Sequence, residues 1–289
     1  MTPTDATQLL DGYRIERLEL KHITWVQAII GHTLSFDSAL WAEAPYEGGQ
    51  TQRAYDMYVA IGPSADECIR SGLSYGVFKE DWKPHFDDTN PGGQLRWDTA
   101  NRNANKDELL KQMDFPLVSV AMTKRTRGKG EAKPHPGDEV KKWHEIIPLF
   151  GTISAAFKKQ EADNHHDFLR DLEDKEKKIA RRSGTHTRFD YRGKKLMKAL
   201  AHYIMDELAK EFDMVAIQST SETVTQVWEN PPEGYKATVT GVFNTAEYLK
   251  KDKDGEMVHP FGAAKVVCKK IYVDLKPRGG ASGEGSGGA

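Results

Sequence analysis

The stretch FDYRGKKLMKAL, residues 189–200, joins a strand-like segment to a helical segment through one glycine. Beyond that glycine, large apolar residues recur at every fourth position from Leu196 to Phe212. This spacing places them on one side of an α-helix and predicts a helix of about five turns over residues 193–212. A short strand is expected just before it, at 185–189, so the helix starts at the edge of a sheet.

Three basic residues, Arg192, Lys194 and Lys195, surround the start of this helix. The first-turn N–H groups of a helix have no intrahelical partner, and the helix dipole is positive at that end. Free amides and nearby cations suit a phosphate or pyrophosphate group. Two interpretations therefore stand side by side: a cradle for a phosphate, or a packed helix whose basic residues are only solvated.

A second basic stretch, RGKGEA at 127–132, also follows an expected strand and matches an Arg-x-x-Gly-x-Ala pattern. Pro134 and Pro136 come soon after it. Two prolines so close together prevent a long helix from starting there, so the dipole and the row of free amides are missing. This stretch is interpreted as a basic loop, and the turn after residue 189 is kept as the phosphate candidate.

The composition is that of a soluble globular chain: 38% of the 289 residues are apolar, 29% are charged, and the formal net charge is −2. This near-neutral balance gives no global basic field for nucleic acid. No apolar run approaches the ~20 residues of a membrane helix, and the N-terminus lacks the pattern of a signal peptide. Cys68 and Cys268 are expected as buried thiols, with a bridge between them as the alternative. A reducing compartment is therefore expected, cytoplasmic or else nuclear.

Hydrophobic periodicity and turn residues divide the chain into strands and helices. Strands are expected at these ranges: 13–20, 68–78, 115–125, 185–189, 214–219, 235–243 and 264–275. Helices are expected at these: 22–36, 51–60, part of 140–160, 165–182, 193–212 and 221–229. Gly62-Pro63 is expected to end the second helix. Residues 80–108 and 126–139 are expected to be loops, and residues 279–289 a flexible Gly/Ser-rich tail.

This order of elements resembles the GNAT superfamily of acyl-CoA-dependent N-acetyltransferases. The family order is strand, two helices, three antiparallel strands, helix, strand, helix and two strands. Two large insertions, at 80–114 and 126–184, interrupt that order here. The resemblance implies an α/β (α+β) fold with a twisted, mostly antiparallel sheet and helices on both faces, forming a single domain over residues 1–278.

The turn before the long helix resembles the family's pyrophosphate turn, Gln/Arg-x-x-Gly-x-Gly/Ala, which wraps acetyl-CoA with backbone amides. Arg192 and Gly193 match it, whereas Lys195 and Met197 stand where the family prefers Gly and Gly/Ala. The resemblance implies acetyl-CoA as co-substrate. It also implies a set of CoA-binding residues: Thr187, Arg188, Phe189, Arg192, Gly193, Lys194, Lys195, Leu196, Ser221, Val224 and Trp228.

The next short helix resembles a second family signature in altered form. Ser221, Val224 and Trp228 stand where the family often has Asn, Ala and Tyr, and that Tyr often protonates the departing CoA thiolate. An indole N–H is not a usable acid, so Trp228 cannot take this role. Tyr235 is assigned as the acid by proximity in sequence, with Tyr191 as the other candidate, and the alternative for each tyrosine is a structural role. Unassisted departure of the thiolate and CoA binding without turnover both stay open.

Acetyl transfer also needs a neutral amine, and because an alkylammonium group has a pKa of ~10.4, a base must remove a proton. The resemblance places the reaction where the 185–189 strand separates from the 214–219 strand, with a backbone amide stabilising the oxyanion. His186 and Glu222 are the predicted bases. The alternatives are a packed or surface histidine for His186 and support of its own helix dipole for Glu222. Asp190 also lies nearby, and its alternative is to cap the turn.

No metal is expected. His135, His165 and His166 do not match the ligand spacing of a closed zinc site. The expected partner is an amine, carried by a small molecule or by a protein, and neither nucleic acid nor membrane is expected. The acidic and aromatic stretch EDWKPHFDD, residues 80–88, suggests a cleft for a cationic amine lined by Asp87 and Asp88, or alternatively a solvated loop.

The function that the resemblance implies is transfer of the acetyl group of acetyl-CoA to a primary amine, directly, in a ternary complex. The alternative is a catalytically inactive CoA-binding module of the same fold that acts through protein partners. Trp228 and Lys195, which depart from the family pattern, favour that alternative. A third, weaker hypothesis is an unrelated α+β protein whose 193–212 helix is only core.

Overall fold

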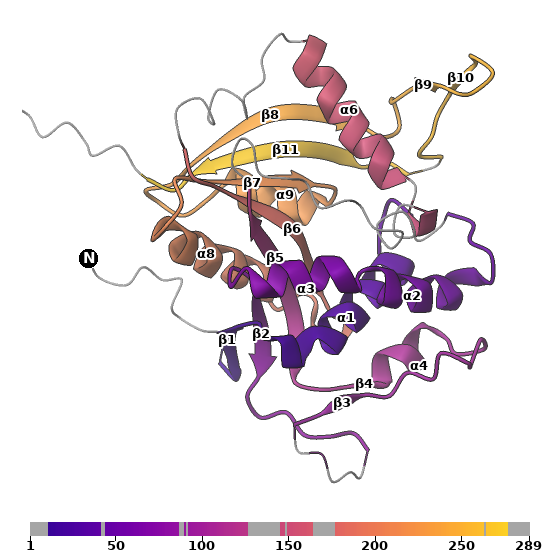
Figure 1. Ribbon diagram of the computed structural model, residues 1–289, viewed down its shortest axis with the longest axis vertical. Helices are drawn as coiled ribbons and strands as arrows, with labels where there is room; N and C mark the ends of the chain where they lie inside the picture. Colours follow the sequence, from indigo (N-terminus) through magenta and orange to yellow (C-terminus); the bar gives the residue numbers. More distant parts are fainter. Residues whose placement is uncertain are drawn as a thin grey trace, which may run out of the picture.

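The computed structural model describes residues 11–41, 44–86, 90, 92–126, 145–147, 149–163, 177–262 and 264–276. Its centre is a seven-stranded sheet with the strand order β1, β2, β5, β6, β7, β11, β8 (Figure 1). The strands have these bounds: β1 Tyr13–Arg17, β2 Tyr75–Lys79, β5 Leu117–Arg125, β6 Ile179–Thr187, β7 Met214–Ser219, β8 Lys236–Asn244 and β11 Val267–Asp274. Neighbouring strands are antiparallel except β6 and β7, which are parallel.

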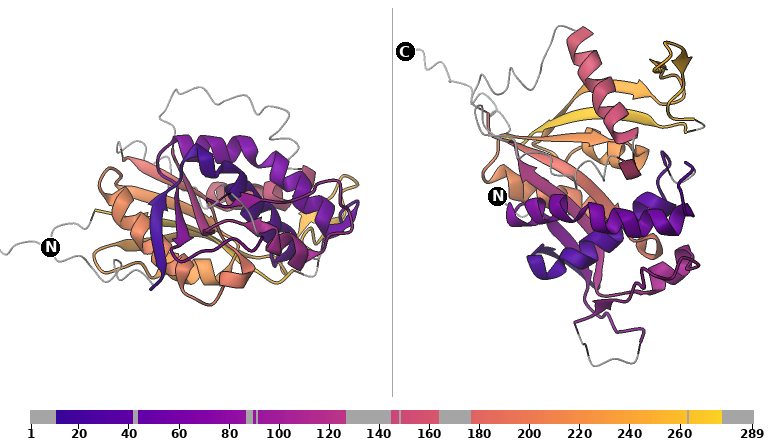
Figure 2. Two further views of the ribbon diagram at one scale, coloured as in Figure 1. Left: turned by 90° about the horizontal axis from the view of Figure 1, so that it is seen from below. Right: turned by 45° about the vertical axis from the view of Figure 1, so that its right-hand side comes forward.

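Helices cover both faces of this sheet (Figure 2). One face carries α1 (Ile23–Phe36), α2 (Gly49–Ala60), α3 (Gly62–Arg70) and, against β8, α6 (Leu149–Asp163). The other face carries α8 (Leu196–Ala209) and α9 (Glu222–Glu229). The mixed fold predicted from the sequence, a mostly antiparallel sheet between two helix layers, is confirmed.

Each face of the sheet has its own apolar core. Val120 and Ala121 are neighbours on β5 but belong to different cores, because successive strand side chains point to opposite faces. The first core packs α1, through Ile29, against Val120. The second packs α8, through Leu200, against Val215 of β7. The two strands that matter below, β6 and β7, are therefore held from both sides.

The apolar stripe predicted for the long helix is confirmed, because these residues of α8 are buried: Leu196, Leu200, Ile204 and Leu208. The helix begins at Leu196 and not at residue 193. Gly193 has a φ of 77° and Lys195 a φ of 59°, and neither value belongs to a right-handed helix. The connection from β6 to α8 is therefore longer than predicted, and it includes a short 3-10 turn at Phe189–Tyr191.

Gly62-Pro63 does mark the end of α2, which stops at Ala60 as predicted, but the same two residues also start a further helix that was not predicted. α3 follows α2 almost directly, with Pro63 in its first turn, where the missing N–H of proline leaves no helical bond unmade. Cys68 consequently lies in α3, and the strand predicted over 68–78 begins only at Tyr75.

The prediction was also wrong at the start of β6. The charged helix expected over 165–182 is a strand from Ile179 onward, and residues 164–176 lie outside the described part of the chain. Ile179, Ala180 and Arg181 pair in parallel with β7. Pairing with a strand distant in sequence has overridden the local helical pattern.

The 80–114 insertion has more regular structure than the loop that was predicted. It contains these elements: β3 Gln94–Leu95, α4 Lys106–Lys111 and β4 Met113–Asp114. α4 starts with a capping box in which the Asn105 side chain accepts from the N–H of Glu108. One further hairpin separates β8 from β11 in sequence, formed by β9 (Lys250–Lys251) and β10 (Met257–Val258).

Several predictions concern residues outside the described ranges: the basic loop at 127–132, the paired prolines that follow it, and the tail at 279–289. Within the described ranges, every helix falls short of the length and apolar character that a bilayer crossing demands.

Candidate functional site

The parallel strands β6 and β7 pair at one end and separate at the other. Their pairing runs from Ile179 opposite Met214 to Arg181 opposite Ala216. This paired part is called the closed end. Beyond it, β6 continues along β5 and β7 continues along β11. The separated part, Arg182–Thr187 and Ile217–Ser219, is called the open end, and there the facing backbone edges have no strand partner in each other.

A β-bulge lies where the strands part. Thr123 of β5 is opposite Arg182, whereas Met122 is opposite Gly184, so Ser183 lies opposite no residue of β5. A bulge bends its strand and increases the local twist. This bend carries β6 away from β7 directly after their last pair.

The side chain of Arg182 holds this bulge from within. Its guanidinium donates to the carbonyl oxygens of Met122 (2.8 Å) and Gly184 (3.1 Å), on the two strands that the bulge separates. It also donates to the hydroxyl oxygens of Thr123 and Thr185. Arg182 is only 6% exposed, and burial lowers its pKa to about 10. The side chain therefore stays cationic at neutral pH.

Trp228, which stands at the predicted position of the family acid, lies against Arg182. The guanidinium carbon is 5.6 Å from the centre of the indole ring, and Trp228 is fully buried. The indole N–H and the Nε–H of Arg182 both lack an acceptor among the described residues. α9 thus places Trp228 beside Arg182, where β6 and β7 part.

His186 lies on the open end of β6 and points toward α1. Its Nδ1 is 2.8 Å from the hydroxyl oxygen of Thr33, which itself donates to the carbonyl of Ile29. This arrangement assigns the imidazole proton to Nδ1 and leaves Nε2 as an acceptor. Burial lowers the pKa of His186 to about 4, with further contributions from the charges of Arg182 and Arg192. His186 is therefore neutral at physiological pH.

The other two predicted catalytic residues lie at different ends of β7. Glu222 is exposed in the first turn of α9, directly after the open end, and Ser221 is the N-cap residue beside it. Tyr235 precedes Lys236, which is paired through Asp274 to the first residue of β7. The structure therefore places Tyr235 at the closed end, and proximity in sequence was a poor guide.

The hydroxyl of Tyr235 has another partner. It donates to Oδ1 of Asp206 on α8 at 2.7 Å. Burial and this hydrogen bond raise the pKa of Tyr235. The position and the bonding of Tyr235 fit a structural contact between the start of β8 and α8.

Polar side chains at the end of β6 and just after it form hydrogen bonds to other parts of the protein. Arg188 is buried, and its guanidinium donates to the carbonyl of Met113 at 2.8 Å and to Asp190 at 2.8 Å. Asp190 is thus neither the cap of α8 nor a free base. Thr187 shares a hydrogen bond with Ser119, whereas the large apolar side chain of Phe189 is exposed. The predicted ligand-binding role of Arg188 is not supported by its side chain, which holds the β4–β5 segment in place.

The turn into α8 leaves its amides available. No side chain caps the helix, and its first backbone bond runs from the N–H of Ala199 to the carbonyl of Lys195. The N–H groups of Leu196, Met197 and Lys198 precede that bond and are the orphan donors of a helix start. A phosphate group fits such a start, both by hydrogen bonding and by charge.

Lys195 adopts the conformation that the family's glycine would supply. Among the described residues it is the only non-glycine residue with a positive φ. A lysine in this region carries a steric cost of its Cβ that glycine avoids. Lysine at this position, where the family prefers glycine, therefore strains the backbone of the turn locally.

Two cations flank this turn from different sides. The Lys194 ammonium is 3.2 Å from the hydroxyl oxygen of Tyr13 and 5.1 Å from the centre of the Tyr191 ring. Arg192 is 43% exposed, and its Nη2 lies 3.4 Å from Oδ2 of Asp37.

The sequence did not single out the polar cluster around Asp37. This carboxylate follows α1, is 2% exposed, and pairs with Lys106 of α4 at 2.5 Å. The Lys106 ammonium also lies 3.6 Å from the centre of the Phe189 ring. No local pattern could have revealed the cluster, because its members come from α1, the 80–114 insertion and the turn before α8.

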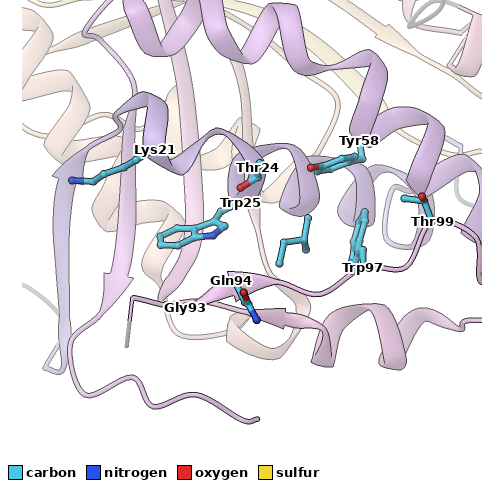
Figure 3. Close-up of a pocket in the computed structure, with 9 residues that line it drawn as sticks. Lys21, Thr24, Trp25, Tyr58, Gly93, Gln94, Trp97 and Thr99 are labelled. Carbon is cyan, nitrogen blue, oxygen red and sulfur yellow. The ribbon is translucent and has the colours of Figure 1, made fainter. Parts of the chain in front are cut away.

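A separate cavity of about 460 Å³ lies on the outer side of α1 (Figure 3). These residues line it: Lys21, Thr24, Trp25, Tyr58, Gly93, Gln94, Leu95, Trp97 and Thr99. None of them belongs to β6, β7, α8 or α9. Asp87 and Asp88, the predicted amine-binding pair, lie outside the described residues. No group of three or more His, Cys, Asp or Glu side chains in the described ranges is arranged to hold a metal ion.

Comparison with known proteins identifies the fold. No protein-family model matches the chain, and no curated protein sequence matches it. Among solved structures, arylalkylamine N-acetyltransferase 2 from Aedes aegypti has a TM-score of 0.54 at 14% identity, over 92% of this chain and 100% of that one. A putative arylalkylamine N-acetyltransferase 7 from the yellow fever mosquito has a TM-score of 0.53 at 11% identity, over 91% and 88%.

Proposed function

We propose that this protein, which has the fold of the GNAT superfamily, transfers the acetyl group of acetyl-CoA to a primary amine. One observation carries the proposal: the uncapped first turn of α8 is the next helix start after the open end of β6, from which the connection over residues 188–195 separates it. A place for a pyrophosphate thus follows a place for an extended chain along the sequence.

The turn and the strand divide the binding of the co-substrate between them. The amides of Leu196, Met197 and Lys198 face the pyrophosphate, and Arg192 and Lys194 add charge. The unpaired edge of β6 offers backbone groups to the pantetheine arm. Acetyl-CoA supplies an activated acetyl thioester at the open end.

Transfer is direct in this proposal. The amine nitrogen forms a bond to the carbonyl carbon, the C–S bond breaks with its electron pair on sulfur, and the amine proton goes to a base. Both cysteines are fully buried, and burial raises their thiol pKa, to about 12 for Cys268. Neither is suited to carry an acetyl group between two half-reactions.

The proton acceptor comes from the open end. Nε2 of His186 is unprotonated at neutral pH and is free to accept, although a pKa of about 4 makes it a weak base. Glu222 is exposed at the start of α9 and acts through water in the same proposal. We assign the proton to this pair and not to Tyr235, which lies at the closed end.

The acceptor is a primary amine of a small molecule or of a protein. The two cysteines are free thiols, which fits a reducing compartment, and we place the protein in the cytoplasm or nucleus.

The test is calorimetric titration with acetyl-CoA and, separately, with desulfo-CoA, followed by an amine screen that detects free CoA thiol. Micromolar binding of both ligands, with amine-dependent release of thiol, supports the proposal. Binding without release for any amine favours the inactive CoA-binding module instead. Absence of binding at millimolar ligand rejects CoA chemistry altogether.

A further inference from the structure

The positive charge of Arg182 is buried and has no counter-ion among the residues that the structure describes. All four acceptors of its guanidinium are neutral: the carbonyls of Met122 and Gly184 and the hydroxyls of Thr123 and Thr185. No carboxylate of the described residues forms an ion pair with it or contributes to its pKa. Burying a charge without an ionic partner is unfavourable, and hydrogen bonds to neutral acceptors offset only part of that cost.

The titratable groups around Arg182 do not neutralise it either. Cys68 of α3 faces it, and burial raises the pKa of that thiol. His186, two positions beyond Gly184 on β6, has a lowered pKa. Both are neutral at pH 7, so the guanidinium sets the electrostatic potential at the point where β6 and β7 part.

Trp228 stands at the sequence position of the family acid, and it contacts Arg182. The two side chains touch, with 5.6 Å between the guanidinium carbon and the ring centre. Each also has a buried N–H donor, Nε of Arg182 and Nε1 of Trp228, for which the described part of the chain offers no acceptor. Two unsatisfied donors beside an uncompensated cation form an environment that favours an anion.

We propose that Arg182, together with the indole N–H of Trp228, stabilises the departing CoA sulfur as a thiolate, in place of an acid that would protonate it. This inference rests on the proposed function. When the C–S bond breaks, its electron pair stays on sulfur, the amine proton goes to the base or to water, and Arg182 keeps its own proton. The electrostatic term is realised mainly in the transition state, where the negative charge develops.

The direct test needs no amine and no turnover. Ultraviolet absorbance of the thiolate is followed through a pH titration of CoA bound to the protein, with the desulfo-CoA complex as the blank. A free thiol has a pKa of ~8.5, and a nearby cation is expected to lower the value by about one unit or more. A bound thiol whose pKa equals or exceeds that of free CoA overturns the proposal.

Two substitutions separate charge from structure. Arg182→Gln removes the charge and is expected to return the bound thiol to its ordinary pKa. Arg182→Lys keeps the charge and is expected to keep the lowered value. The matched control is Arg181→Gln, which removes an exposed cation from the adjacent position of β6 and leaves the thiol pKa unchanged. If the glutamine variant does not fold, the wild-type and lysine titrations still decide.

Kinetics give a second, independent readout. Arg182→Gln is expected to lower kcat about 10- to 100-fold at a nearly unchanged KM for acetyl-CoA. Trp228→Tyr supplies an acid, so the loss from Arg182→Gln is expected to shrink to less than about 5-fold in that background. An equal loss in both backgrounds shows that Arg182 only holds the bulge and overturns the proposal. Failure of wild-type protein to bind CoA rejects the proposed function itself, and this inference with it.

Discussion

The two ends of the β6–β7 pair use the same two strands in opposite ways. At the closed end the polar groups bond to one another. The N–H of Lys178 donates to Oδ2 of Asp213 at 2.9 Å, and the N–H of Asp213 donates to the carbonyl of Lys178 at 2.9 Å. The N–H of Leu275 donates to the carbonyl of Asp213 at 2.8 Å. Ile179 and Met214 complete the closed end with a small buried cluster.

At the open end the polar groups stay unsatisfied or strained. Arg182 and the adjacent Trp228 each keep a buried donor that finds no acceptor among the described residues. In the turn that follows β6, Lys195 holds a positive φ, and the first turn of α8 is uncapped. Such groups are rare in a folded protein and concentrate at functional sites. Under the proposed function, the closed end contributes to stability and the open end to ligand binding, so substitutions at the two ends should affect different measurements.

The largest expected effect is on ligand binding at the open end. Arg192→Glu with Lys194→Glu replaces two cations at the α8 turn by two anions. CoA affinity is expected to fall at least ~100-fold, since a charge-assisted contact contributes about 1.5 to 3 kcal/mol. Calorimetric titration measures it. The matched control is Lys251→Glu with Lys253→Glu, the same change in charge near the exposed β9–β10 hairpin, and comparable weakening there would remove the distinction between the two ends.

The next effect is a pH dependence of stability from His186. Burial, with the charges of Arg182 and Arg192 behind it, lowers its pKa to about 4. Between pH 6.5 and 4 the unfolded chain binds a proton that the folded protein excludes, so stability is lost as pH falls through this window. The expected loss is about 1 to 3 kcal/mol.

Urea unfolding across this pH window checks the His186 prediction. His186→Gln keeps a hydrogen-bonding group for Thr33 and is expected to remove this part of the pH dependence. An NMR titration of the His186 ring with a midpoint near 6.5 would contradict the prediction, because the folded protein would then not lower the pKa of His186.

A substitution at the closed end is expected to change the stability of the fold and to leave CoA affinity unchanged. Asp213→Ala removes the acceptor of the Lys178 N–H and the partner of Lys276, and it is expected to destabilise the fold by about 1 to 2 kcal/mol. The Lys178 N–H is the main cause of the lowered pKa of Asp213, followed by Lys276. The contribution is therefore present above about pH 4 and lost as the carboxylate is protonated. CoA affinity should not change, and a clear drop in affinity would mean that the two ends are coupled.

The smallest effect is a gain in stability at the open end. Lys195→Gly places a glycine at a φ of 59° and is expected to stabilise the fold by about 1 kcal/mol. Lys198→Gly, within the first turn of α8, is the control of opposite sign, because glycine there is unfavourable by about 1 kcal/mol. Thermal or urea unfolding measures both. Destabilisation by Lys195→Gly would show that the lysine side chain makes a compensating contact.

Much of the C-terminal half could be predicted because its patterns are local. The apolar stripe from Leu196 to Leu208 appears in the sequence with helical spacing. The strand β7 and the helix α9 follow at nearly the predicted residues. Where β6 starts was not predictable from such patterns. Residues 179–182 look like the end of a charged helix, and only the parallel pairing with β7 makes them a strand.

The candidate site divides in the same way. Gly193 and the surrounding cations were identified from their position between a strand and a helix. Sequence reasoning did not single out Arg182, Asp37 or Lys106, because only segments distant in sequence bring them beside the predicted residues. Tyr235 was included wrongly, since proximity along the chain does not measure distance across a sheet.

The sequence by itself determined the order of the elements, the amphipathic helix α8, and the basic turn before it. Periodicity and turn chemistry act over a few residues, so these features are written locally. Only the tertiary structure decided that β6 and β7 part at Arg181, that a bulge follows, and that a buried guanidinium meets Trp228 there. These features depend on strand register and on packing between distant segments, and no local stretch of sequence contains them.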